Sequence, residues 1–444
     1  MVQDSDGRKS GFDALARLCN PPSDGMGERN RTAIAITYAM VPLAGSLTSL
    51  CIVLLWIWAG ISLVVGRLAW RPLGAAAPLV WSQVAFFLAL AAGDFINGDP
   101  LIAARDSFLR LFFLMPVLAV HRVALTRPSA VFDAVFRGAA IGGVIVPFVA
   151  IAVIAVTGEI RAQGFAGNPG PLSIVCLLTT GLALLGLRAT QSTAWNALAC
   201  LGAFGAGLTV VMTGMRGAWP ALLPVLAIAL WHRRSDIAIV WSGIARMQKT
   251  VAVLGLAALA ALGVVLGGDY IVDRSLLLAR DFEVLFASAD VATTVSLRAE
   301  MYQAGMQAFW QRPLFGWGQD GLPGAVSPFL GSLYGGGFFF THLHNGFLTV
   351  GVQAGLVGIA ALCAALLSPV VCAWRRRDEE AGATRLAVSL VLVTAFLIPG
   401  LTNIMFFHDI LDAVWALSVW TIAGTLMADT ERTAGTAGSG RERP

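Results

Sequence analysis

Long apolar runs separated by short polar breaks occupy the sequence from residue 32 to residue 427. A helix that crosses a bilayer needs ~20 consecutive, predominantly apolar residues. By this length rule the pattern predicts about twelve membrane-spanning helices. They lie near residues 32–45, 47–66, 76–93, 107–120, 134–156, 171–187, 193–212, 217–231, 250–267, 345–373, 384–403 and 409–427. The first apolar run is divided in two because Pro42 and Gly45 favour a tight turn.

The composition agrees with a membrane protein. Hydrophobic residues make up 57% of the 444 residues, charged residues make up 13%, and the mean hydropathy is +0.76. Soluble domains average about 45–50% apolar and about 25% charged residues. A closed β-barrel would show short alternating strands in place of long apolar runs, so the predicted fold class is an all-α polytopic bundle. The net charge of +4 is modest, and we expect no nucleic-acid partner.

The polar segments predict the orientation and the domain organisation. Residues 1–31 contain acids and prolines but no apolar core, which predicts a cytoplasmic tail rather than a signal peptide. Residues 428–444 are small and polar and are expected to be a disordered cytoplasmic tail. Between them, residues 32–427 form the transmembrane domain, with one large outer loop at 268–344 in which Ser296–Trp310 has helical spacing.

The basic residues of the short loops give a positive-inside pattern when the N-terminus lies inside. These residues are Arg67, Arg71, Arg122, Arg127, Arg188, Arg233, Arg234, Arg246, Lys249, Arg375, Arg376 and Arg377. The large loop then lies on the outer side, where we expect a cap of short helices over the bundle.

Three predicted spans that run inward from the outer side begin with candidate functional residues. Asn168-Pro169 and Pro220 fit the preferences of the first helical positions. The N-terminus of a helix carries partial positive charge and favours phosphate. Arg161 and Arg216 add planar, permanently charged groups that bind phosphate oxygens in a fork. A pyrophosphate at the bilayer surface is the ligand that this pattern indicates.

Each arginine also has a simpler interpretation. Arg216 would lie near a span end, where an arginine side chain often extends to the lipid headgroups. Arg161 has Glu159 nearby and would then form a local ion pair. Arg298, in the predicted cap, is a candidate for binding the sugar or phosphate part of a substrate.

The third inward span begins at His344, which follows His342 in a chain that has only 5 histidines. Histidine is the side chain best suited to move a proton near neutral pH. The alternative for His344 is a polar helix cap. A zinc site would need further ligands, and no cysteine or third histidine is near in sequence, so no metal and no cofactor are expected.

These motifs resemble the O-antigen ligase and polymerase superfamily of bacterial membrane glycosyltransferases. The segment His344-Asn345-x-x-Leu348, followed by Gly355, is similar to the family's histidine motif at the end of its large periplasmic loop. The segment Gly214-Met215-Arg216-Gly217-Ala218 is similar to its short arginine turn, although a small polar residue is common where Met215 stands. Arg161-x-x-Gly164, followed by Asn168-Pro169, is similar to its other arginine loop, and residues 298–318 are similar as well.

The resemblance implies a GT-C-like, metal-independent enzyme of the bacterial inner membrane with its active site facing the periplasm. Such enzymes move a glycan from undecaprenyl diphosphate to an acceptor hydroxyl on lipid A-core, on a growing glycan or on a protein, with inversion. His344 and Arg216 would then be catalytic, and Arg161, Arg298, His342 and Asn345 would bind substrate. We expect a ligase acting on lipid A-core, with membrane lipids as surroundings.

Two other functions remain open at this point. A polymerase of O-antigen or exopolysaccharide belongs to the same superfamily and is the main alternative. A transporter of lipid-linked sugar would need a polar path through the bundle, whereas the spans contain few charges and the candidate residues gather at one surface.

Overall fold

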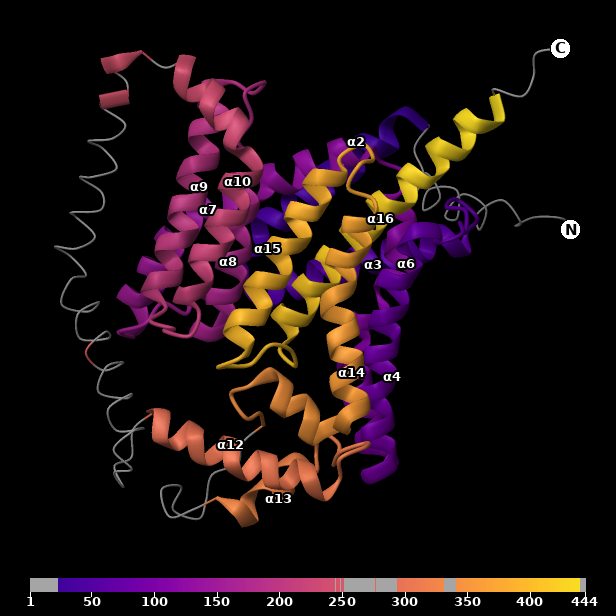
Figure 1. Cartoon of the computed structure of the whole chain (residues 1–444), viewed down its shortest axis with the longest axis vertical. Coiled ribbons are helices and arrows are strands. Elements are labelled where there is room, and N and C mark those ends of the chain that lie inside the picture. Colours follow the sequence, from indigo (N-terminus) through magenta and orange to yellow (C-terminus); the bar gives the residue numbers. More distant parts are fainter. Residues whose placement is uncertain are drawn as a thin grey trace, which may run out of the picture.

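The computed structural model describes residues 23–243, 245–247, 249–250, 276, 294–330 and 341–439, and all regular secondary structure in them is helical (Figure 1). The elements are α2 (Ser23–Met40), α3 (Ser46–Val64), η1 (Gly74–Ala76), α4 (Ala77–Asn97), α5 (Pro100–Leu109), η2 (Leu111–Leu114), α6 (Pro116–Val123), α7 (Pro128–Thr157), η3 (Gly164–Ala166), α8 (Pro169–Leu185), α9 (Thr193–Met212), α10 (Trp219–Gly243), α12 (Thr294–Gln311), α13 (Leu322–Val326), η4 (Ser327–Phe329), α14 (Gly346–Arg375), α15 (Gly382–Gly400) and α16 (Asp409–Ser439). The predicted span near 250–267 lies outside the described residues after Thr250, as does much of the predicted loop at 268–344.

The chain is a multi-pass membrane protein, as its apolar pattern predicts. Within the described residues, seven helices are long and apolar enough to cross a membrane: α3, α4 with η1, α7, α9, α14, α15 and α16 up to Ala428. The apolar helix α8 is shorter, and α2 and α10 complete the bundle (Figure 1). The all-helical prediction is confirmed, whereas the predicted count of twelve spans is not.

Both predicted tails contain helix. α2 begins at Ser23, within the segment 1–31, and Asn30 is buried against the bundle. α16 continues to Ser439, within the segment 428–444.

The predicted span at 107–120 is three short pieces instead of one helix. α5 ends at Leu109, the 3-10 turn η2 follows, and α6 starts at Pro116. Proline has no N–H to donate to the preceding turn, so a new helix begins there. Arg110, at the first break, is buried and pairs with Asp94 of α4. Its Nη2 also donates to Gln319 Oε1 at 2.6 Å, which ties the bundle to the segment after α12.

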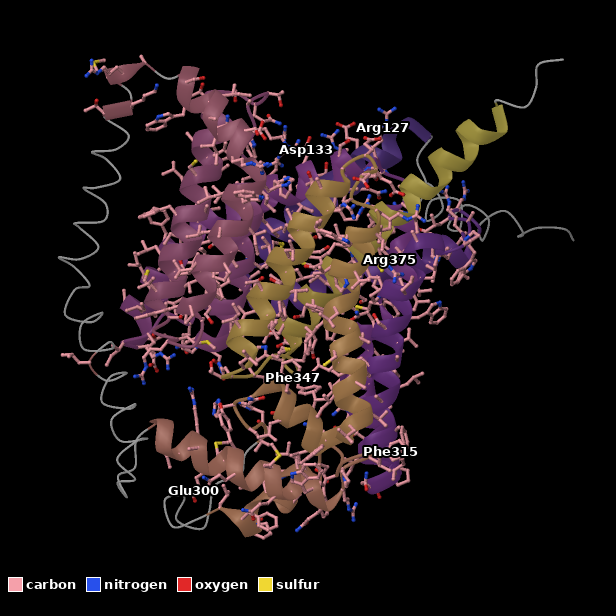
Figure 2. All side chains as sticks on the ribbon, viewed as in Figure 1. Arg127, Asp133, Glu300, Phe315, Phe347 and Arg375 are labelled. Carbon is pink, nitrogen blue, oxygen red and sulfur yellow. The ribbon has the colours of Figure 1, made fainter. Side chains whose placement is uncertain are left out.

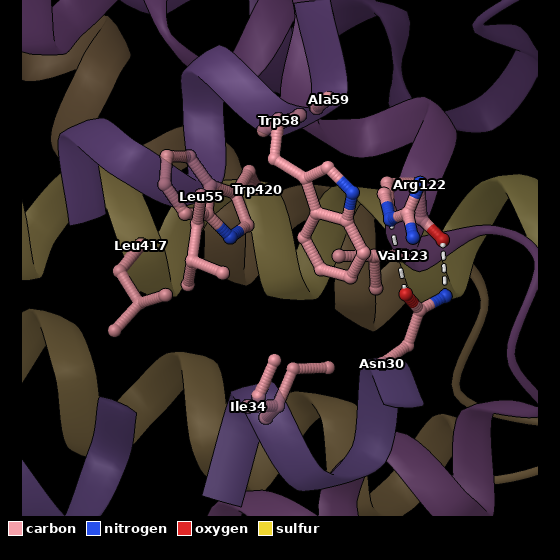
Figure 3. Close-up of a pocket in the computed structure, with 11 residues that line it drawn as sticks. Asn30, Ile34, Leu55, Trp58, Ala59, Arg122, Val123, Leu417 and Trp420 are labelled. Atoms are coloured by element: carbon pink, nitrogen blue, oxygen red, sulfur yellow. Dashed lines mark hydrogen bonds between the residues drawn. The ribbon is translucent and has the colours of Figure 1, made fainter. Parts of the chain in front are cut away.

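Most basic residues of the short loops lie at one end of the bundle, called the basic end below, where Figure 2 places Arg127 and Asp133. Glu300 and Phe315 lie at the opposite end. Arg122 fastens α2, α3 and α6 together at the basic end (Figure 3). Its Nε donates to Asn30 Oδ1 at 3.1 Å, and its guanidinium carbon lies 3.4 Å from the centre of the Trp58 ring. A buried guanidinium is held by hydrogen bonds and a cation–π contact, because desolvation without partners would be unfavourable.

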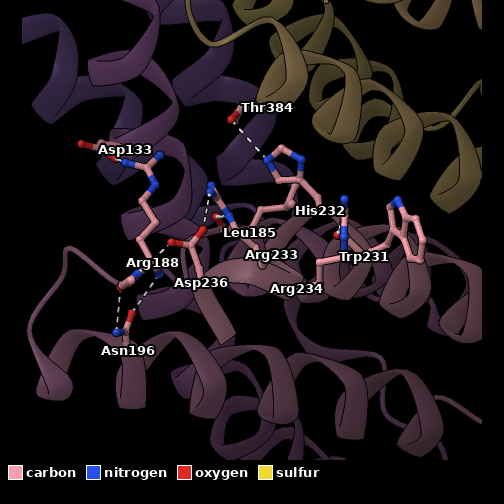
Figure 4. A network of polar contacts seen from close by, with 11 residues as sticks. Asp133, Leu185, Arg188, Asn196, Trp231, His232, Arg233, Arg234, Asp236 and Thr384 are labelled. Atoms are coloured by element: carbon pink, nitrogen blue, oxygen red, sulfur yellow. Dashed lines mark hydrogen bonds and ion pairs between the residues drawn. The ribbon is translucent and has the colours of Figure 1, made fainter. Parts of the chain in front are cut away.

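A second polar network holds α7, α8 and α10 at the same end (Figure 4). Arg188 pairs with Asp133 of α7. Asp236 of α10 accepts from the backbone N–H of Ala189 at 3.0 Å, and Arg233 Nε donates to Leu185 O at 2.8 Å. Arg188 of the α8–α9 loop and Arg233 of α10 thus connect the ends of adjacent helices.

Beyond the opposite end, α12, α13 and η4 form a cap, in agreement with the helix predicted at Ser296–Trp310 (Figure 1). The cap has its own apolar core, which includes Met301 and Leu322 and extends to Val352 of α14. The segment 313–318 docks where α14 is kinked at Gly355, whose φ is +65°. Trp317 N donates to Val352 O at 2.8 Å. A side chain at Gly355 would meet the backbone of this segment, so the kink requires glycine.

Candidate active site

A cavity of about 440 Å³ lies where the cap meets the bundle. Five segments contribute to its wall: the loop that leads into α8, the turn between α9 and α10, helix α12, the residues before α14, and the connection between α15 and α16. The lining residues are Arg161, Asn168, Pro169, Gly170, Gly214, Met215, Arg216, Gly217, Arg298, Thr341, His342, His344, Thr402, Asn403, Ile404, Phe407 and His408. Five of the six site residues named from the sequence are therefore neighbours of one space.

The His344 ring is oriented by Asn403 from the α15–α16 connection. Nδ1 of His344 lies 3.0 Å from Oδ1 of Asn403. Asn403 Nδ2 donates to the sulfur of Met215 at 3.4 Å, which assigns the oxygen of the amide to the histidine. His344 therefore carries its proton on Nδ1 and keeps the lone pair of Nε2 for a substrate.

Met215, which departs from the small polar residue common in related turns, thus has a polar role. Its buried sulfur receives the Asn403 amide and also lies 2.8 Å from Ser173 Oγ. The arginine turn and the histidine are linked through this sulfur. Asn403 was not among the residues singled out from the sequence, and its only local signal is a polar break between two apolar spans.

The backbone at His344 is held in an unusual conformation. Its φ is +50°, and Phe407, which also lines the cavity, has a φ of +69°. Tyr302 of α12 donates its hydroxyl to the carbonyl of His344 at 2.8 Å, and the buried N–H of Leu343 donates to Thr349 Oγ1 at 3.0 Å. Non-glycine residues in this region need support from their surroundings and tend to occur at functional sites. Two of the three such residues in the described ranges border this cavity.

The histidines are poised to be neutral. Burial lowers the pKa of His344, with Arg298 lowering it further, although the Asn403 hydrogen bond opposes this. Burial, together with the nearby His344, Arg298 and His408, lowers the pKa of His342 to about 4. The rings of His342 and His344 meet edge to face, 4.5 Å between centroids. A neutral imidazole at neutral pH is a competent proton acceptor.

Arginine dominates the charge of the wall. Arg161 is anchored to the neighbouring turn, because its Nε donates to Thr213 O at 2.7 Å. Arg216 lies in that turn between α9 and α10, and Arg298 reaches the cavity from the cap. The described lining residues include no carboxylate. The cavity is thus an electropositive pocket, suited to a ligand with more than one negative charge.

The N-terminus of α8 contributes less than the sequence indicated. In the first turn of α8, Pro169 and Pro171 have no N–H, and Gly170 N donates to the side chain of Asn168 at 2.8 Å. Leu172 N is bonded to Asn168 O at 3.4 Å. The first turn of α8 therefore offers its dipole to an anion but no N–H group.

Asn345 is placed differently from the other predicted site residues. It is the N-cap of α14: its Oδ1 accepts from Leu348 N at 2.9 Å, and its Nδ2 donates to Leu401 O at 3.1 Å. It is absent from the cavity wall. Asn345 follows His344 in the sequence because it caps α14, and this cap holds His344 directly before the first turn of the helix.

His408 is a third histidine on the wall, and only folding brings it close to the other two. Its Nδ1 lies 3.2 Å from Asp409 Oδ1, and Asp409 Oδ2 accepts from Ser49 of α3 at 3.1 Å. Burial lowers the pKa of His408, and Asp409 opposes that shift. In the part of the chain that the structure describes, no group of three histidine, cysteine or acidic side chains is arranged to hold a metal ion.

Comparison with known protein families gives a match for part of the chain. Residues 201–363 fit the family model described as O-antigen ligase. This segment includes Arg216, Arg298, His342 and His344, and it begins within α9 and ends within α14. No curated protein matches the chain.

Proposed function

We propose that this chain, a member of the O-antigen ligase and polymerase superfamily, is a ligase that transfers a glycan from undecaprenyl diphosphate to an acceptor hydroxyl of lipid A-core. The observation that carries the proposal is the pairing of an oriented neutral histidine with three arginines around one cavity. A diphosphate donor needs cationic partners, and an attacking hydroxyl needs a base. The cavity provides both.

Arg161, Arg216 and Arg298 would bind the diphosphate. Their positive field stabilises the charge that develops on the leaving phosphate oxygen as the glycosidic bond breaks. Guanidinium groups suit this role because they bind phosphate oxygens through two N–H groups at a time. The electrons of the broken C1–O bond leave with the diphosphate.

His344 Nε2 would accept the proton of the acceptor hydroxyl while the acceptor oxygen forms its bond to the anomeric carbon. Attack opposite the diphosphate inverts the configuration at that carbon. The neighbouring Asn403 keeps the proton of the neutral ring on Nδ1, so that Nε2 presents its lone pair. General-base assistance contributes about 10²–10⁴-fold to the rate.

His342 and His408 would contact the sugar or the diphosphate. Burial lowers the pKa of both rings, so each is neutral in the open cavity. Positive neighbours lower the pKa of His342 further, whereas Asp409 opposes the shift at His408. A bound diphosphate would add negative charge beside them and favour their protonation. The proposal therefore includes proton uptake on donor binding.

The test is His344→Gln in proteoliposomes that contain a lipid-linked glycan donor and lipid A-core. We expect transfer to fall by about 10²–10⁴-fold while donor binding is kept. His121→Gln, which removes a buried histidine at the basic end, is the matched control and should retain transfer. Transfer at the wild-type rate by the His344 variant would exclude this base.

The glycan profile of a deletion strain tests the acceptor. Loss of all long chains from lipid A, with free lipid-linked chains accumulating, supports ligation. Chains shortened to a single repeat would show polymerisation and would refute the choice of lipid A-core. Gradient-dependent movement of donor without transfer would indicate transport.

A further inference from the structure

A second cavity, of about 640 Å³, lies between α10 and α15. It is at the basic end of the bundle, whereas the candidate active site is at the cap end. One part of its wall is polar and includes Arg234, Arg377 and Asp378. The rest is apolar and includes Ile228, Leu386 and Leu390. Nothing in the proposed transfer reaction uses this space.

Both arginines are fixed in place by a neighbouring tryptophan. Arg234 Nη1 donates to Trp231 O at 2.8 Å, and its guanidinium carbon lies 4.5 Å from the centre of the Trp231 ring. Arg377 Nη1 donates to Trp374 O at 3.2 Å, and its guanidinium carbon lies 4.6 Å from the centre of the Trp374 ring. Figure 4 shows Arg234 beside Trp231 and turned away from Asp236, whereas Arg233 points into the buried network.

The two tryptophans are exposed, 71% for Trp231 and 56% for Trp374. Exposed tryptophans in membrane proteins gather at the level of the lipid headgroups. The stacked guanidinium groups are therefore held at headgroup depth, where an arginine binds phosphate. Asp378 is only a weak competitor for Arg377, since its carboxylate is 90% exposed and 3.9 Å from the guanidinium.

The apolar part of the cavity is hollow because small residues line it. Ala227, Ala383 and Ala387 leave space between the larger side chains of the two helices. The space opens beside the arginines, so one ligand with a negative headgroup and an acyl chain would fill both parts.

We propose that this cavity binds one anionic phospholipid, with its phosphate on Arg234 and Arg377 and an acyl chain along α10 and α15. The positive charge of the two arginines distinguishes an anionic lipid from a second copy of the chain and from a zwitterionic lipid. A second copy that used the same face would bring its own Arg234 and Arg377 against this pair, and the like charges would repel. A zwitterionic lipid would gain less from two fixed cations than an anionic lipid does.

The test compares purified full-length protein with phosphatidylglycerol and with phosphatidylcholine of the same acyl chains, by native mass spectrometry and by thermal unfolding in mild detergent. We expect wild type to retain phosphatidylglycerol selectively and to unfold at a higher temperature with it. Each basic residue near an anionic surface contributes about a fivefold gain in affinity, so Arg234→Gln with Arg377→Gln should bind phosphatidylglycerol about thirtyfold more weakly.

The control removes the same charge elsewhere at the same end, through Arg127→Gln with Arg375→Gln, and should keep the preference. Ala383→Trp fills the cavity from an exposed position without changing charge and should also abolish retention. Equal loss in the control pair would show diffuse attraction to the basic end and would overturn the proposal. Retention by Ala383→Trp, no headgroup preference in wild type, or a dimer that Ala383→Trp dissociates would overturn it as well.

Discussion

Asn403→Asp is the substitution that most directly examines the proposed base. The change is nearly isosteric and puts a carboxylate where the amide oxygen now lies 3.0 Å from His344 Nδ1. An opposite charge at this distance favours the protonated ring, whereas burial in the native site lowers the pKa of His344. The two effects therefore act in opposite directions on the same group.

The sign of the effect on the rate follows from which form is active. The neutral ring accepts the proton, so transfer is supported above the pKa of His344 and is lost as the pH falls through it. A neighbouring carboxylate should move the midpoint of this acid limb up by about 1 to 3 pH units. For each pH unit by which the midpoint exceeds the assay pH, transfer falls about tenfold, and it recovers as the pH is raised.

The assay is the initial rate of glycan transfer in proteoliposomes between pH 5 and pH 9 at saturating donor. Two control variants separate the effect of a carboxylate at Nδ1 from the effects of added wall charge and of a lost hydrogen bond. Ile404→Asp adds a carboxylate to the same wall without replacing the partner of Nδ1, and should weaken donor binding more than it moves the midpoint. Asn403→Ala removes one neutral hydrogen bond, worth about 0.5–1.5 kcal/mol, and should slow transfer roughly two- to tenfold with no upward movement. An unchanged midpoint in Asn403→Asp would refute His344 as the base.

Three further substitutions examine the surroundings of the site. Arg216→Lys keeps the charge but removes the fork, so transfer should fall at least about tenfold in the same assay; full activity would mean that charge alone is enough. Met215→Leu conserves volume and removes the sulfur acceptor of Asn403, so transfer should fall several-fold while the unfolding temperature changes little, and wild-type transfer would show that the sulfur has no orienting role. Arg110→Met leaves the Asp94 carboxylate buried and unpaired, which should destabilise the protein by about 3–5 kcal/mol in unfolding assays; Asp94→Leu in the same chain should restore much of that loss, and no restoration would contradict a simple charge-pair account.

The cap shows which structural features the local sequence pattern predicted and which it did not. The helix predicted at Ser296–Trp310 is present as α12, because its apolar residues recur at helical spacing and the Pro-Gly segment after it stops the helix. The spacing did not reveal that this segment would hydrogen-bond into the kink of α14. In the sequence, Gly355 stands out only through the resemblance of the segment after His344 to a family motif, and no local pattern indicates a kink there.

The fourth predicted span failed for a related reason. A hydropathy window averages over Arg110 and Pro116 and sees one apolar stretch. The buried ion pair of Arg110 with Asp94 makes a charge inside the bundle tolerable, and that pairing depends on a partner in another helix.

The linear sequence was enough to predict that this chain forms apolar helices and that most basic residues of its short loops lie at one end. It was also enough to predict that Arg161, Arg216 and His344 precede the first turns of apolar helices. Each of these properties is local, since length, hydropathy and capping act over a few turns. The side chains that surround the histidine became known only from the folded chain. Asn403 is 59 residues from His344 and 188 residues from Met215, and His408 approaches from the same connection. Contacts over such separations depend on how helices pack against one another, and no periodicity within a single helix encodes them.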